Sequence, residues 1–229
     1  MVTAAQVKTY LQPLIDDNDD LALVGRLLVV KPVTHVLRGV LIDRRSSAET
    51  IKPVWFTYHM FGPYPTYFLS WGDELSARNW RTDQLDIGQA LCAEISNFVL
   101  PRLRPIVSLE DFLTTIPATR AWHLLSISSK LRSLIDIATG DLDTARLLCR
   151  ENICNRADPG PKEPDVTKGE AAGAKVLCKM LEENDIEGVI AQLHAWEKTN
   201  VKALKLTPYW QPSPFPIEEK LGLKIWQAI

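Results

Sequence analysis

Three titratable residues have the types and spacing for acid–base chemistry: His59, Asp73 and Glu74. His59 lies in an apolar run, and the two carboxylates directly follow the next run, beyond the turn-forming sequence Gly62–Pro65. If the two runs pair as strands through that turn, an imidazole and a carboxylate come together at one end of a sheet, where they could transfer protons. An enzyme of unrecognised type is therefore one hypothesis. The alternative is that these side chains only form turns and surface ion pairs, and no GxSxG motif or glycine-rich phosphate loop accompanies them.

Aromatic side chains are concentrated between residues 55 and 80. Because aromatic residues dominate ordinary protein cores, the first interpretation is that they fill the core and a domain interface. The second interpretation is an exposed platform for a protein partner or a small ligand. The candidate binding residues under that second interpretation are Trp55, Tyr58, Tyr64, Trp71 and Trp80.

The sequence predicts no metal site and no cofactor. Asp16, Asn18 and Asp20 resemble the first three ligands of a calcium loop, but Leu21 and Leu27 stand where the turn glycine and the bidentate glutamate belong. A solvated helix end is the better interpretation of this acidic run.

The four cysteines are Cys92, Cys149, Cys154 and Cys178. They lack the tight pairs of a zinc site, and their wide distribution is not typical of a disulfide framework. We therefore expect reduced, mostly buried thiols. The first residues lack the pattern of a secretory signal, so we expect a cytoplasmic protein.

The elements that would position these residues follow from changes in hydrophobic period. Thr3 and Gln6 predict a capping box for an N-terminal helix. Four apolar runs follow with connections too short for crossover helices, which predicts a four-stranded antiparallel meander. These runs are 21–30, 35–43, 53–61 and 66–71, the last closed by a turn at 72–73, and a covering helix at 87–99 should bury Phe98 and stop at Pro101.

The second half of the chain predicts helices. Ser108 caps one helix, and a longer helix over 119–139 ends at Gly140, with Asp141 capping the next. A second helical pair has a similar turn at Asn184 and Asp185. The fold class is therefore α+β, a four-stranded antiparallel meander covered by helices and followed by a small helical bundle.

Two regions follow from this pattern. Residues 1–105 form a helix–antiparallel sheet–helix module, and residues 106–229 form a helical half with a Pro/Gly-rich loop at 155–169. The join between them lacks the composition of a flexible linker, so we expect them to pack as one compact unit.

Composition narrows the classes of partner. The 26 basic and 28 acidic residues give a net charge of -2, without the basic excess of a protein that binds nucleic acid. The apolar run at 21–30 is interrupted by Arg26 and is too short to cross a membrane. We expect neither nucleic acid nor membrane as a partner.

Three segments, Leu37–Ile42, Val54–Tyr58 and Leu69–Leu75, resemble those of uncharacterised bacterial proteins in which a small α/β domain precedes a helical tail. The resemblance covers about the first half of the chain and implies a binding role, as in accessory or immunity proteins that accompany toxins. The function expected is therefore a non-catalytic protein-interaction protein with an unidentified protein partner. The alternatives are a small-ligand-binding protein and an enzyme that uses His59 with Asp73 or Glu74.

Overall fold

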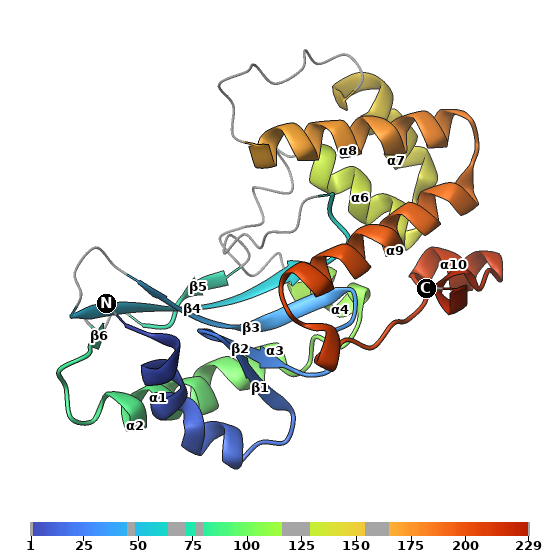
Figure 1. Ribbon diagram of the computed structural model, residues 1–229. Coiled ribbons are helices and arrows are strands. Elements are labelled where there is room, and N and C mark those ends of the chain that lie inside the picture. Colours follow the sequence, from blue (N-terminus) through green and yellow to red (C-terminus); the bar gives the residue numbers. More distant parts are fainter. Residues whose placement is uncertain are drawn as a thin grey trace. The chain divides into compact units, whose positions relative to one another are not determined.

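The computed structural model of the protein describes residues 2–44, 49–63, 72–76, 80–115, 129–153 and 165–228 (Figure 1). Its chain divides into two units, each built from several segments. The sheet unit comprises Met1–Tyr58, Tyr67–Ala121 and Pro208–Gln211, and the helical unit comprises His59–Thr66, Trp122–Thr207 and Pro212–Ile229. This division differs from a boundary near residue 105, because residues 59–66 group with the helices, whereas residues 106–121 and 208–211 group with the sheet.

Helix α1 (Ala4–Asp16) begins at the predicted capping box. The Thr3 hydroxyl accepts a hydrogen bond from the Gln6 N–H, and the Gln6 side chain accepts one from the Thr3 N–H. Pro13 lies inside the helix without ending it. The buried face of α1 consists of Val7, Leu11 and Leu14.

The run at 21–30, predicted as one strand, is a hairpin of two strands, β1 (Leu21–Val24) and β2 (Leu27–Val30). The chain reverses at Gly25, whose φ is +65°, and Val24 pairs with Leu27 across this two-residue connection. A glycine takes such a φ without steric cost, which is why it favours hairpin turns. The described residues contain a six-stranded sheet, so the prediction of four strands was wrong. This hairpin accounts for part of the difference.

The remaining strands are β3 (Val36–Arg44), β4 (Thr50–His59), β5 (Gly72–Glu74) and β6 (Trp80–Arg81). The order is β1-β2-β3-β4-β5, and β6 also pairs with β4. Gly72 and Asp73, predicted as a turn, belong to β5, where a Cβ atom on Gly72 would overlap the Trp55 backbone of the neighbouring strand. The predicted strand at 66–71 lies outside the described residues.

The covering helix at 87–103 has an irregular middle. It consists of α2 (Ile87–Glu94), a π-helical turn η2 (Ile95–Val99) and α3 (Leu100–Leu103). Pro101 was predicted to stop this helix, but the widened turn before it accommodates the missing N–H, and the helix continues. The same turn moves Phe98 off the buried face, so that this side chain is 56% exposed instead of buried as predicted.

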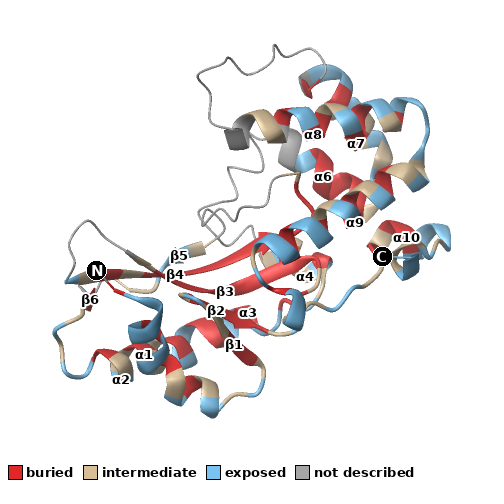
Figure 2. Ribbon diagram, viewed as in Figure 1, coloured by how far each residue is buried: buried red, intermediate tan, exposed pale blue. Residues whose placement is uncertain are grey.

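The covering helix packs closely on α1, and the two lie on one side of the sheet (Figure 1). A Cβ atom on Gly88 would lie 3.3 Å from the Tyr10 backbone, and the Cys92 thiol donates to the Tyr10 carbonyl. The core of the sheet unit lies between these helices and the strands (Figure 2). Helix α4 (Leu109–Thr115) follows, and Ser108 caps it as predicted, donating to and accepting from Asp111.

The helical unit contains α6 (Ser129–Thr139), α7 (Leu142–Leu148), the π-helical turn η4 (Cys149–Ile153), α8 (Asp165–Glu182) and α9 (Ile186–Ala203). After the short 3-10 turn η5 (Thr207–Tyr209), the chain forms α10 (Pro216–Leu221) and η6 (Ile225–Ala228). Residues 165–169, predicted as loop, form the first turn of α8. The α+β class is confirmed by this arrangement. Among the helices of the described residues, none is long and apolar enough to cross a membrane.

Candidate functional site

The histidine and carboxylates proposed for acid–base chemistry lie at different positions along β4. Strand pairing places Asp73 opposite Trp55 and Glu74 opposite Val54, whereas His59 is four residues further along β4 than Trp55. The Glu74 carboxylate forms an ion pair with Lys52. His59 is buried beside Phe61, and this burial lowers its pKa to about 4. The register therefore gives the acid–base hypothesis no support.

The aromatic candidates that the structure describes belong to the core. Trp55, Tyr58 and Trp80 are all less than 9% exposed, Trp80 only 2%. Such side chains have little surface for a protein partner, so their burial favours the first interpretation, that they fill the core. Tyr64 and Trp71 lie outside the described residues.

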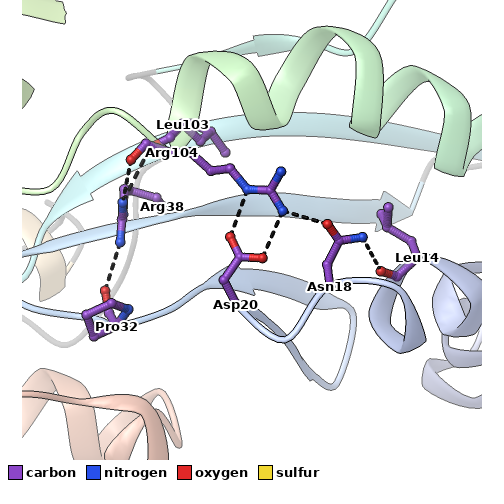
Figure 3. Close-up of polar contacts among 7 residues, drawn as sticks. All are labelled: Leu14, Asn18, Asp20, Pro32, Arg38, Leu103 and Arg104. Carbon is purple, nitrogen blue, oxygen red and sulfur yellow. Dashed lines mark hydrogen bonds and ion pairs between the residues drawn. The ribbon is translucent and has the colours of Figure 1, made fainter.

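A polar network in the sheet unit uses the acidic run after α1 (Figure 3). The Arg104 guanidinium donates to both oxygens of Asp20 at 2.8 Å and to Asn18 Oδ1 at 2.6 Å. These bonds lower the pKa of Asp20 and raise that of Arg104. Two of the three calcium-like residues are thus paired with a cation.

Arg38, which is buried, completes this network (Figure 3). Its guanidinium donates to the carbonyls of Leu103 and Arg104 at the end of α3 and, at 2.9 Å, to the Pro32 carbonyl. A cation at the C-terminal end of a helix satisfies carbonyls that have no partner inside the helix, and it interacts favourably with the helix dipole. Burial lowers the pKa of Arg38, opposed by the charges of Asp20 and Asp111. The arrangement holds the elements together and leaves Arg38 inaccessible to an external anion.

The helical unit contains two helical hairpins with similar turns. Helices α6 and α7 are joined by a turn at Gly140, and α8 and α9 are joined by a turn at Asn184. Both turn residues have a positive φ, +84° and +56°. The next residue in each turn is an aspartate: Asp141 accepts from the Thr144 N–H at 3.2 Å, and Asp185 accepts from the Gly188 N–H at 2.9 Å. The two hairpins thus have the same helix end and the same helix start.

The backbone hydrogen bonds of the two turns also match. The N–H of Asp141 donates to the Asp136 carbonyl and that of Asp185 to the Met180 carbonyl, five residues back in both cases. The turns are 44 residues apart, and several buried positions repeat at this offset. The buried pairs are Leu134 and Cys178, Ile137 and Leu181, Ala145 and Val189, and Cys149 and Leu193. The two hairpins therefore share their turn and part of their buried face, although α6 and α7 are shorter than α8 and α9.

A disulfide between Cys149 and Cys178 joins the two hairpins. Cys149 begins η4 after α7, Cys178 lies in α8, and both are almost fully buried. The prediction of reduced thiols at these positions was wrong. The pairing spans 29 residues, and no spacing pattern in the sequence indicates which cysteines meet.

Helix α10 contacts both hairpins through separate side chains. Glu218, fully buried, lies with Oε2 2.6 Å from Nε2 of His194 on α9. Its oxygens also accept from the N–H groups of Phe215 and Trp226, at 2.9 and 3.0 Å. The Lys220 ammonium donates to the Thr139 carbonyl at the end of α6. This short helix is therefore a clamp across the module.

Residues 60–62, which follow β4 and belong to the helical unit, contact α9. Asn200 on α9, itself buried, donates to the carbonyls of Met60 and Gly62 at 2.6 and 2.9 Å. The rings of Phe61 and Phe215 meet edge to face, with centroids 5.2 Å apart. Asn200 thus satisfies backbone groups that would otherwise be buried without partners.

The sequence does not indicate that Glu218 is the neighbour of His194. The two residues are 24 positions apart, so no local pattern joins them. Within the described ranges, no group of three or more histidine, cysteine, aspartate or glutamate side chains is placed to hold a metal ion. Comparison of the chain with protein-family models, with curated proteins and with solved structures finds no match.

Proposed function

We propose that this chain is a non-catalytic protein-interaction protein and that the paired hairpins α6–α7 and α8–α9 form its binding module. The observation that carries the proposal is the repetition of the same turn, cap and buried positions at an offset of 44 residues. Proteins built from stacked helical hairpins use the surface of the stack to bind other proteins. We further propose a cytoplasmic, accessory or immunity-like role in a bacterium, in keeping with the resemblance of the first half of the chain.

Two hairpins are fewer than the three repeats that a free-standing stack needs, so the module requires additional support. The clamp α10 supplies it, because Glu218 binds α9 while Lys220 binds the end of α6. Capping elements of this kind close the ends of repeat arrays. The support allows the remaining helix surface to stay open to a partner.

The open surface of the hairpins includes two large apolar side chains. Leu147 on α7 is 46% exposed and Val176 on α8 is 44% exposed. A protein partner that covered these two side chains would remove their apolar surface from water, which favours association. A protein partner is the occupant that we propose for this surface.

The test is a comparison of three tagged chains in a lysate of the source organism. We expect the wild type to capture one protein stoichiometrically and Leu147→Asp, Val176→Asp to lose it. Leu221→Asp on α10 is the matched control, because Leu221 is similarly exposed, at 52%, but lies outside the hairpins.

Binding must then be reproduced with the purified partner, with Kd raised at least tenfold in the double variant. Capture that is equal in all three chains would contradict the proposed surface. If no protein is captured and a metabolite raises the melting temperature, the proposal fails in favour of a small-ligand-binding protein.

A further inference from the structure

We infer that the Cys149–Cys178 disulfide makes the hairpin module redox-sensitive, by fixing the two hairpins against each other when oxidised and releasing them when reduced. The inference rests on the proposed function only in that it concerns regulation of the same module. The reductant is a dithiol of the kind that maintains reduced thiols in cytoplasm.

The position of the disulfide carries this inference. It joins the end of the first hairpin to the first helix of the second, so it crosses between the two repeats instead of closing either one. The equivalent buried positions in the opposite hairpins hold Leu193 and Leu134. Apolar side chains therefore fill the positions equivalent to the two cysteines, and the disulfide adds a covalent constraint that packing does not require.

Apart from the buried apolar packing of α6, α7 and η4 against α8, the described polar contacts between the hairpins are exposed. The Arg146 guanidinium on α7 donates to Asn184 Oδ1 at 2.9 Å, an exposed hydrogen bond, while the clamp α10 reaches α6 through Lys220, also at an exposed site. Exposed polar contacts contribute little to stability. Loss of the disulfide should therefore loosen the contact between hairpins more than the hairpins themselves.

Reduction proceeds by two exchange steps. A thiolate of the dithiol attacks one sulfur, the S–S bond breaks, and a mixed disulfide forms with release of the other cysteine thiolate. The second thiol of the reductant then displaces the remaining cysteine, so that the reductant leaves as a cyclic disulfide and the protein gains two electrons and two protons.

Burial controls the rate of this reaction. Both cysteines are no more than 1% exposed, so the attacking thiolate reaches sulfur only after local opening. Cys149 begins the π-helical turn η4, an irregular place in the helix where opening is expected to be easier. The rate should therefore rise with reductant concentration and then reach a plateau set by opening.

The experiment uses the full chain carrying Cys92→Ser and Cys154→Ser, so that only Cys149 and Cys178 can contribute free thiols. Dithiothreitol should convert zero free thiols into two, lower the melting temperature by about 10 °C and raise amide exchange in α7 and α8 by about 100-fold. A further Cys149→Ala, Cys178→Ala variant should have the lower melting temperature from the start and should not respond to dithiothreitol.

Two outcomes would overturn the inference. One is two free thiols after equilibration in oxidised glutathione, because the bond would then not form. The other is complete reduction that leaves both the melting temperature and the exchange of α7 and α8 unchanged. None of these measurements involves a partner, so failure here is distinguishable from failure of the proposed binding function.

Discussion

Glu218 provides the sharpest test of how the clamp α10 is held. Its Oε2 lies 2.6 Å from His194 Nε2 and accepts from the Phe215 N–H, while Oε1 accepts from the Trp226 N–H. We predict that Glu218→Gln destabilises the helical unit. Glutamine has the same shape but only one acceptor oxygen, so its NH₂ group must face at least one of these donors.

The expected cost follows from that conflict. A buried donor left without an acceptor costs about 1–3 kcal/mol. We therefore expect a loss of about 2 kcal/mol in the free energy of unfolding. Glu219→Gln is the matched control, because Glu219 is the exposed neighbour on the same helix, and should change stability by less than about 0.5 kcal/mol.

Urea unfolding of both variants, with amide exchange of Trp226 as a local readout, measures the difference. Exchange of the Trp226 N–H should accelerate in Glu218→Gln and not in Glu219→Gln. If the two variants unfold at the same urea concentration as the wild type, the hydrogen bonds of Glu218 do not hold α10 in place, and the account of the clamp is wrong.

Two further predictions concern buried positions. Burial lowers the pKa of His59 to about 4 from its ordinary 6.5, so the fold favours the neutral ring: stability is full above pH 6.5 and falls by about 3 kcal/mol as the pH drops towards 4. Urea unfolding from pH 7 to pH 4 should show this loss in the wild type and less of it in His59→Gln, and equal slopes would refute the assignment to His59. Gly173→Ala, which in an exposed helix would stabilise by about 1 kcal/mol, should instead lower the melting temperature, because the added Cβ overlaps the Pro63 ring. A raised melting temperature would show that Pro63 does not pack there.

The features that the sequence predicted are those decided by a few neighbouring residues. Thr3, Ser108 and Asp141 cap helices as expected, because each cap depends on backbone groups within three positions, and Asp185 does the same in the turn noted as similar. The turn inside the run at 21–30 could have been predicted in the same way, since Gly25 and Arg26 interrupt an otherwise apolar stretch, but the run was interpreted as one strand. The π-helical turn before Pro101 has no comparable signal.

The features that the sequence did not predict depend on residues far apart in the chain. Cys149 meets Cys178 across 29 positions, and Glu218 meets His194 across 24. The burial of Trp55, Tyr58 and Trp80 is of the same kind, because an aromatic strand looks identical whether its faces are covered or exposed. The repeat of the hairpins was visible in the turn residues, but its extent became clear only from the burial of equivalent positions.

The division of the chain into interleaved segments has a consequence for synthesis. The polypeptide passes between the sheet unit and the helical unit five times, and Val33, near the start, pairs with Trp210, near the end. The Val33 N–H donates to the Tyr209 carbonyl, and its own carbonyl accepts from Gln211. A nascent chain on the ribosome therefore holds an incomplete sheet unit until residue 211 has emerged, although most of that unit was translated far earlier. During this interval Val33 lacks its native backbone partners. The N-terminal segments are therefore where a chaperone would bind the nascent chain.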